Sequence, residues 1–220
     1  MGSQIGKGGT GTEFGVFVTI DGGAHWAQFK GNFPTAGVRG MVIQPRAQEL
    51  VLGSYGRSIW IVDMAPLQQL TLDVLSSEAH LFDVIPGVLF RTRYTYGATI
   101  EQLNGDMFFR GENPPFGTMI TYYLRDDLGD VTLSITDEHG DAVRTLTGPG
   151  APGLHRINWD LQPDDPETTS YAATASEREF QLRVTPGTYT VTLQLGGTAL
   201  SQQIAVVLEG DGVRRNVIRK

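Results

Sequence analysis

The stretch DVTLSITDEHGDAVRTL, residues 130–146, decides the fold class of this chain. Apolar and polar residues alternate along residues 130–137, and a second run of strand-forming residues follows at 142–146. Alternation with a period of two is typical of a strand that has one buried and one solvated face. The stretch therefore predicts two consecutive strands joined by a short turn.

Strands of the same kind are expected on both sides of this stretch. They fall at residues 88–96, 118–125, 154–161, 180–184, 188–195 and 199–208. Their number and spacing predict an immunoglobulin-like β-sandwich over residues 84–210, because such domains hold about 7–9 short strands in about 100 residues. The polar stretch 163–179 predicts a loop, and residues 211–220 are expected to be a tail.

The first third of the chain predicts a separate group of strands. They fall at residues 14–20, 25–29, 38–43, 49–54 and 58–62, which are rich in β-branched and aromatic side chains. The last three are joined by short loops, which is typical of a meander. The chain is therefore expected to be all-β, with two groups of strands.

Residues 65–83 are expected to be a linker between the two groups. Pro66 is a plausible first helical residue, and leucine and valine side chains follow at roughly helical spacing up to Leu75. A short, imperfect helix and an irregular loop with buried leucines fit this pattern equally well.

Composition excludes several classes of function. The hydrophobic fraction of 40% and the charged fraction of 19% are those of a folded globular protein. The net charge of −7 disfavours nucleic acid and anionic membranes as partners. No apolar run is long enough to span a membrane. Residues 1–10 lack the apolar core of a signal peptide and are expected to be a tag or the cut edge of a longer chain.

No metal or cofactor is expected. The chain has no cysteine, which excludes a disulfide, a thiolate nucleophile and a cysteine-ligated zinc ion. The four histidines show no metal-binding spacing. The acidic pairs at residues 126–127 and 164–165 are expected to be solvated turn residues. A calcium site in a loop is the alternative, although no D-x-D-x-D-G pattern supports it.

The stretch TIDGGAHW, residues 19–26, resembles the Asp-box, S/T-x-D-x-G-x-x-W, of BNR-repeat β-propellers such as sialidases and the luminal domain of sortilin. Its anchor positions are Thr19, Asp21, Gly23 and Trp26. The aspartate can accept turn N–H groups, the glycine tolerates a positive φ, and the tryptophan is expected to pack beneath the hairpin. In that family the box lies away from the active face, so the resemblance implies a structural role.

Residues 11–63 (GTEFGVFVTIDGGAHW … GSYGRSIWIVD) resemble the last blades of a bacterial sortilin-like propeller of the BNR/YVTN type, a group often labelled glycosyl hydrolase by similarity. The propeller strands are expected to span residues 11–64. The resemblance implies an extracytoplasmic location, secreted or periplasmic. A propeller needs about 4–8 blades of four strands. This chain is therefore expected to hold an incomplete propeller, and its exposed strands favour a weak homodimer over docking on the chain's own sandwich.

Residues 130–191 resemble the immunoglobulin-like domain of flagellar hook-capping protein, and related domains end secreted bacterial propeller proteins. The resemblance implies a hairpin turn, a core aromatic residue and a glycine-led strand. The hairpin turn is expected at Asp137–Gly140, and the core aromatic residue is Trp159. Pro186 and Gly187 begin the strand that contains Tyr189. In such proteins the sandwich is an accessory domain.

A sialidase-type mechanism needs three arginines, a Tyr–Glu pair and an Asp acid/base from several blades. The arginines before residue 90 are Arg39, Arg46 and Arg57, and the glutamates before residue 78 are Glu13 and Glu49. So few blades cannot surround a sugar, and no catalytic residue is assigned. Aromatic side chains for a carbohydrate platform are Tyr94, Tyr96, Tyr122 and Tyr123, although packing is the better interpretation for three of them.

The function expected from the sequence is that of a non-catalytic structural or interaction module of a larger secreted protein. Its ligand is an unknown protein or carbohydrate. The alternative is an accessory C-terminal fragment of a BNR-repeat glycoside hydrolase whose active blades lie upstream. An assembly domain for a surface or secretion apparatus is a third possibility, which rests on analogy of fold alone.

Overall fold

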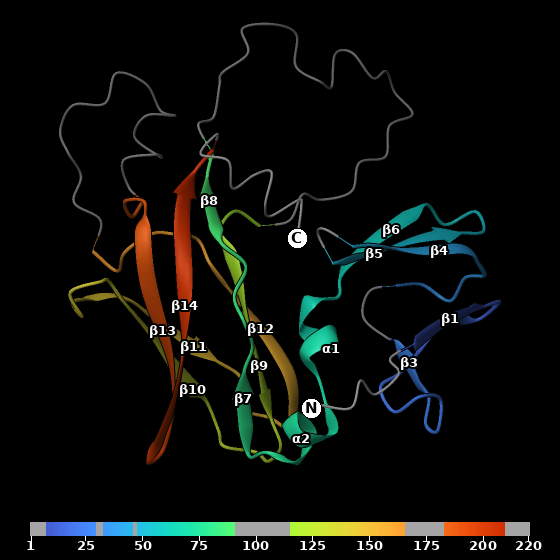
Figure 1. The fold of residues 1–220 in the computed structure, drawn as a ribbon, viewed down its shortest axis with the longest axis horizontal. Coiled ribbons are helices and arrows are strands. Elements are labelled where there is room, and N and C mark those ends of the chain that lie inside the picture. The colour runs from blue at the N-terminus through green and yellow to red at the C-terminus, as the bar shows by residue number, and fades with distance from the viewer. Residues whose placement is uncertain (1–7, 30–32, 46–47, 91–114, 166–182, 210–220) are drawn as a thin grey trace, which may run out of the picture.

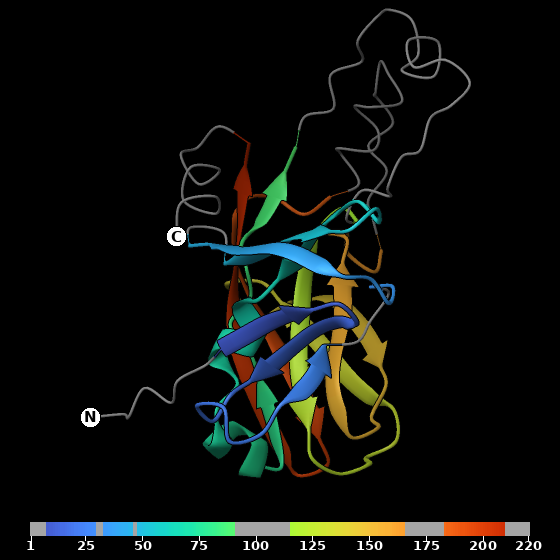
Figure 2. The same ribbon diagram turned by 90° about the vertical axis from the view of Figure 1, so that its right-hand side faces the viewer.

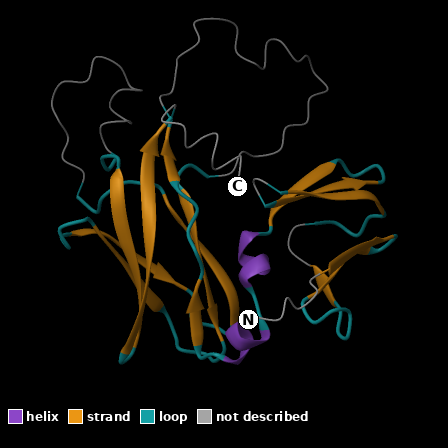
Figure 3. Cartoon of the chain, in the orientation of Figure 1, coloured by secondary structure: helices purple, strands orange, loops and turns teal. Residues whose placement is uncertain are grey.

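The computed structural model of the chain describes residues 8–29, 33–45, 48–90, 115–165 and 183–209. These residues form four β-sheets and two short helices (Figure 3). The all-β class expected from the alternating pattern is confirmed. Among the described helices, none is long and apolar enough to cross a membrane.

Two sheets face each other in a β-sandwich (Figure 1). The larger sheet has the strand order β11 (Ala142–Gly148), β10 (Val131–Thr136), β13 (Gly187–Leu195), β14 (Thr198–Leu208) and β8 (Gly87–Leu89). The smaller sheet has the order β12 (Gly153–Trp159), β9 (Thr118–Leu124) and β7 (Ala79–Leu81). All neighbouring strands are antiparallel except β14 and β8, which are parallel.

One hydrophobic core lies between the two sandwich sheets. On β10, the side chains of Val131, Leu133 and Ile135 are buried, and the residues between them are not, as a period of two requires. Trp159 is fully buried, and its ring meets that of Tyr189 edge-on at 5.4 Å between centroids. The indole also keeps a hydrogen-bond partner, because its Nε1 donates to the carbonyl of Gln162 at 3.1 Å.

The structure corrects the expected boundaries of the sandwich. Strand β7 lies within the range expected to be linker, yet it pairs with β9, and its Leu81 is buried in the sandwich core. The sandwich therefore begins at Ala79 and not at Val84. Of the strand expected at 88–96, residues 91–96 lie outside the described residues, as do residues 180–182 of the strand expected at 180–184.

The linker contains the helices α1 (Ala65–Gln69) and α2 (Leu72–Ser76), so the short helical linker is confirmed. Pro66 stands in the first turn of α1, and the Thr71 side chain caps α2 by accepting the Val74 N–H at 3.2 Å. Both helices lie between the sandwich and the remaining two sheets (Figure 1). The Tyr123 hydroxyl donates to the Leu75 carbonyl at 3.1 Å, which holds α2 on β9.

The other two sheets come from the first third of the chain. The first N-terminal sheet contains β1 (Gly8–Thr12), β2 (Gly15–Thr19) and β3 (Ala27–Phe29). The second contains β4 (Val38–Gln44), β5 (Glu49–Ser54) and β6 (Ile59–Asp63). Each is an antiparallel meander, and both lie on the same side of the sandwich (Figure 2). Residues 8–10, expected to be a tag or cut edge, belong to β1 because they pair with β2.

The two N-terminal sheets pack on each other through a second, smaller core. Val16 of β2 and Leu50 and Leu52 of β5 are buried in it. Gly11 makes the close approach possible, because a Cβ at this position would lie 2.6 Å from a methyl group of Val38. The second sheet is tied to the sandwich by the ion pair between Asp63 and Arg156, at 2.5 Å.

Candidate functional site

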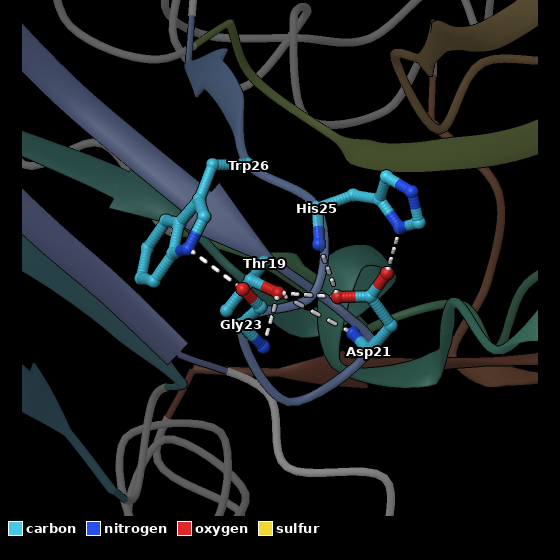
Figure 4. A network of polar contacts seen from close by, with 5 residues as sticks. All are labelled: Thr19, Asp21, Gly23, His25 and Trp26. Atoms are coloured by element: carbon cyan, nitrogen blue, oxygen red, sulfur yellow. Dashed lines mark hydrogen bonds and ion pairs between the residues drawn. The ribbon is translucent and has the colours of Figure 1, made fainter.

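The turn between β2 and β3 contains Thr19, Asp21, Gly23 and Trp26, the residues that resemble an Asp-box (Figure 4). The Thr19 hydroxyl donates to Asp21 Oδ1 at 2.8 Å and accepts the Gly23 N–H at 2.9 Å. Asp21 Oδ1 also accepts the N–H of His25 at 2.9 Å, and Oδ2 lies 2.6 Å from Nδ1 of the same residue. Gly22 and Gly23 take φ values of 76° and 97°, which a side chain would strain. The polar groups of this turn are therefore directed at one another.

This network changes the acidity of Asp21. The hydrogen bond from the His25 N–H holds the pKa of the Asp21 carboxyl well below its usual range, and the His25 ring and the Thr19 hydroxyl lower that pKa further. The folded turn therefore stabilises the charged form of the Asp21 carboxylate.

Trp26 differs from the expectation that it packs beneath the hairpin. Its side chain is 48% exposed. The indole lies against the turn, because its Nε1 donates to the Gly23 carbonyl at 3.1 Å. Trp26 precedes β3 and so stands outside the paired strands, whose packed face is covered by other side chains.

We predict that Asp21→Asn makes the chain less stable at neutral pH and removes part of its acid sensitivity. A carboxyl whose pKa is lowered by folding stabilises the folded state above the unfolded pKa, about 3.9 for aspartate. That stabilisation is progressively lost as the pH falls below this unfolded pKa. Thermal melts between pH 7 and 2.5 should show the wild type and Asp21→Asn converging below about pH 4.

Asp141→Asn is the matched control, because the Asp141 carboxylate makes no hydrogen bond to the described residues. This variant should keep the melting temperature of the wild type at pH 7. Equal melting temperatures of wild type and Asp21→Asn at pH 7 would contradict the structural role of the network.

A second tryptophan turn joins β5 and β6, and the sequence motif did not reveal it. Trp60 Nε1 donates to the carbonyl of Arg57 at 2.7 Å, three residues earlier, as Trp26 does to Gly23. The Ser54 hydroxyl donates across the turn to the Ser58 carbonyl at 2.5 Å. No aspartate stands in this turn, so the only sequence signal was a hydroxyl residue followed by a tryptophan.

A cluster of exposed side chains lies at the start of β2, the end of the strand away from the Asp-box. We call Glu13, Phe14, Arg39, Tyr55 and Arg57 the turn cluster. They come from the β1–β2 turn, the start of β4 and the β5–β6 turn. The rings of Phe14 and Tyr55 are 70% and 71% exposed.

Gly37 brings these turns together. A Cβ at Gly37 would lie 3.7 Å from the Cα of Glu13 and 3.8 Å from the Cβ of Tyr55. The Tyr55 N–H donates to the Gly37 carbonyl at 2.7 Å. The Arg39 guanidinium lies 5.0 Å from the centroid of the Tyr55 ring, within the range of a cation–π contact. The cluster thus combines aromatic faces with both signs of charge.

Of the other residues considered for a sialidase-type site or a carbohydrate platform, Glu49 and Tyr122 lie away from this cluster. Glu49 pairs with Gln44 at the far end of β5. Arg46 lies outside the described residues, as do Tyr94 and Tyr96. Tyr122 is fully buried in the sandwich core. Burial, aided by the charge of Asp130, raises the pKa of Tyr122 to about 12.

The remaining carboxylates singled out in the sequence serve turns and strand edges. Asp137 Oδ1 accepts the N–H groups of His139 and Asp141, each at 2.9 Å, in the turn that contains Gly140. Asp164 Oδ2 accepts the Thr145 N–H at 2.8 Å and so covers the edge of β11. Among the described residues, no group of three or more histidine, aspartate or glutamate side chains is placed to hold a metal ion.

Comparison with known proteins identifies no family. No family model matches the chain, and no curated protein matches it. Among solved structures, S.CueP is similar over 77% of this chain and 75% of its own, with 10% identity and a TM-score of 0.25. The BSP domain of a biofilm associated protein is similar over 93% of this chain, with 11% identity and a TM-score of 0.28. The chain spans 29% of the length of that second protein.

Proposed function

We propose that the chain is a non-catalytic structural and interaction module of a larger, secreted bacterial propeller protein. The two N-terminal sheets act as parts of neighbouring blades, and the sandwich is an accessory domain. The Asp-box supports the structural half of this proposal, because both carboxylate oxygens of Asp21 already have partners within the turn.

The turn cluster carries the interaction half of the proposal. The Arg39 guanidinium lies over the exposed Tyr55 ring, and the neighbouring turns add the exposed Phe14 ring and the charged residues Glu13 and Arg57. Aromatic and arginine side chains are enriched in binding surfaces. Flat rings offer faces for a sugar ring, and a guanidinium can bind a carboxylate through two parallel hydrogen bonds. An acidic glycan is therefore the first ligand to test, and an acidic protein segment is the alternative.

The second candidate function is that of an accessory fragment of a glycoside hydrolase. One observation favours it: Glu13, Arg39 and Tyr55 come together at the end of β2 opposite the Asp-box, where that family places its active face. Against it, the Arg39 guanidinium is stacked on the Tyr55 ring, and Glu49 lies at the other end of its sheet.

An array of neutral and acidic oligosaccharides tests the proposal, together with hydrolysis of a panel of fluorogenic glycosides. We expect binding of carboxylated glycans without hydrolysis, and a loss of about tenfold or more in Tyr55→Ala. Trp26→Ala is the matched control, because it removes a half-exposed aromatic ring from the other end of β2. Hydrolysis that Glu13→Gln abolishes would overturn the proposal in favour of the hydrolase fragment. Binding that ignores Tyr55 would show that the turn cluster is not the site.

A further inference from the structure

The larger sandwich sheet has one protected edge and one open edge. At the protected edge, the Asp164 carboxylate accepts the Thr145 N–H and the Asp164 N–H donates to the Val143 carbonyl, each at 2.8 Å, so Asp164 covers β11. At the other edge, β8 covers β14 only over Val206–Leu208 (Figure 1). Before residue 206, no described residue makes a backbone hydrogen bond to the side of β14 that faces away from β13. We call this side the open edge.

The hairpin between β13 and β14 determines which backbone groups point to the open edge. Its loop has two residues, and it closes on the pair Leu195 and Thr198. The closing pair of such a hairpin is hydrogen-bonded, so even-numbered residues of β14 bond to β13 and odd-numbered residues point away. The far end of β14 agrees, because the Glu209 N–H donates to the last carbonyl of β8 at 3.0 Å. Ser201 and Gln203 therefore direct their N–H and C=O groups to the open edge.

A groove of about 520 Å³ lies at this edge. One wall is formed by three consecutive residues of β14, Ser201 to Gln203, and the other by Asp83 and Val84, in the segment that leads from β7 to β8. The Gln202 Nε2 donates to the Leu81 carbonyl at 3.2 Å and so joins the two sheets beside the groove. The volume is within the range of ligand sites, and one wall consists of strand backbone with free donors and acceptors.

The side chains of β14 do not oppose the addition of a strand. Natural edge strands are commonly protected by charged residues, lysine above all, because these discourage pairing with another strand. The sequence of β14, TALSQQIAVVL, contains no charged residue. The parallel pairing of β8 at the end of the same side shows that this side of β14 accepts a strand.

Asp83 gives the groove a negative charge. Its carboxylate forms no ion pair with any of the residues that the structure describes. His80 lies near enough to feel this charge, but burial outweighs it and holds the pKa of His80 below its usual value. The His80 ring is therefore mostly neutral at pH 7 and leaves the Asp83 charge uncompensated.

We propose that the open edge binds an extended peptide segment that carries a lysine or arginine. The segment adds a strand to the larger sheet in line with β8, and its backbone pairs with the N–H and C=O groups of Ser201 and Gln203. Its basic side chain reaches the Asp83 carboxylate across the groove. An extended backbone is the ligand that fits, because it offers donors and acceptors at the spacing of alternate residues in a strand, about 6.6 Å.

Fluorescence anisotropy with the full chain tests the proposal. The probe is a labelled heptapeptide of threonine and valine with one central lysine. A strand bonds to β14 through the N–H groups of one of its two edges only. N-methylation of alternate residues along one edge of the peptide should therefore weaken binding by about tenfold or more, and methylation along the other edge should weaken it far less. No binding of the probe, or equal binding of both methylated peptides, would overturn the proposal.

Gln203→Pro tests the same contact from the side of the protein. Proline removes the N–H that faces the open edge, and edge strands accept proline because this N–H takes no part in the pairing with β13. The probe should bind at least about tenfold more weakly, because its carbonyl loses a donor and meets the proline ring. Gln203→Val is the matched control, since it changes the same side chain and keeps the N–H. If Gln203→Pro does not fold, the methylated peptides still decide the question on the wild type.

Exchange of the charge at Asp83 tests the basic side chain. The wild type should prefer the lysine peptide to the same peptide with a central glutamate, and Asp83→Lys should reverse the preference. Asp141→Lys makes the same change in the β10–β11 turn, away from the groove, and should keep the preference of the wild type. An unchanged preference in Asp83→Lys would contradict the assignment of Asp83.

This inference is independent of the proposed function, because the open edge and the turn cluster share no residue. Tyr55→Ala should leave peptide binding unchanged, and Gln203→Pro should leave glycan binding unchanged, so failure of one site is distinguished from failure of the other. Analytical ultracentrifugation of the peptide-free chain tests whether a second copy uses the edge instead. Self-association that Gln203→Pro removes, together with no binding of the probe, would overturn the peptide site in favour of pairing between copies.

Discussion

Trp159→Ala is expected to lower the free energy of unfolding by about 3–5 kcal/mol. Trp159 is fully buried at the end of β12, it meets the Tyr189 ring edge-on, and its Nε1 is hydrogen-bonded to the Gln162 carbonyl. Truncation would remove the largest fully buried side chain of the described residues and leave a cavity between the two sandwich sheets. Urea denaturation followed by far-UV circular dichroism measures the loss.

Trp26→Ala is the control for this prediction. It makes the same chemical change at a side chain that is 48% exposed and has one hydrogen bond, to the Gly23 carbonyl. Its cost should be about 1 kcal/mol, the contribution of one hydrogen bond. Equal losses from the two variants would show that Trp159 does not hold the sandwich core together.

Gly117→Ala is expected to cost about 4 kcal/mol, because backbone strain and a steric collision act together. Gly117 precedes β9 with a φ of 118°, a conformation that residues with a side chain rarely adopt. A Cβ there would collide with the carbonyl oxygen of Trp159 and lie 2.9 Å from the Cα of Asp160. These are backbone atoms of the neighbouring strand end, so no side chain can turn aside to make room.

Gly140→Ala separates the two causes. Gly140 also has a positive φ, 87°, but a Cβ there would meet nothing within 4 Å. This variant should lose only about 1–2 kcal/mol, the cost of the backbone conformation. Comparison of thermal melts and soluble yields of the two variants tests the difference. An insoluble Gly117→Ala beside a soluble Gly140→Ala agrees with the prediction, whereas equal melting temperatures contradict it.

The strands of the sandwich could be predicted because local alternation and packing agree there. Along β10 the apolar residues of the sequence are the buried residues of the structure. Strand β7 was missed because three residues are too few to show a period, and only its pairing with β9 makes it a strand. The glycines of β1 carry no side-chain pattern at all, so residues 8–10 could not be distinguished from a tag.

The turn cluster and the exposed face of β6 depend on tertiary contacts. Glu13, Gly37 and Tyr55 are far apart in the sequence and meet only because the two N-terminal sheets stack. The sequence predicted a strand at residues 58–62, but it could not show that Ile59 and Ile61 lie on a face that the described residues leave exposed. The exposure of Trp26 also escaped prediction, because the Asp-box motif specifies the turn and not what covers the tryptophan.

The parallel pairing of β8 with β14 has a consequence for synthesis of the protein. Residue 87 pairs with residue 206, so β8 must wait for β14, which the ribosome makes more than 100 residues later. A chain grows by about 5–20 residues per second, and contacts between distant residues must wait for the later partner. Until β14 emerges, β13 is paired only with β10, and Val88 and Leu89 have no strand to pair with. The sandwich therefore completes its folding only after β14 has left the ribosome, and termination before residue 198 leaves β8 unpaired.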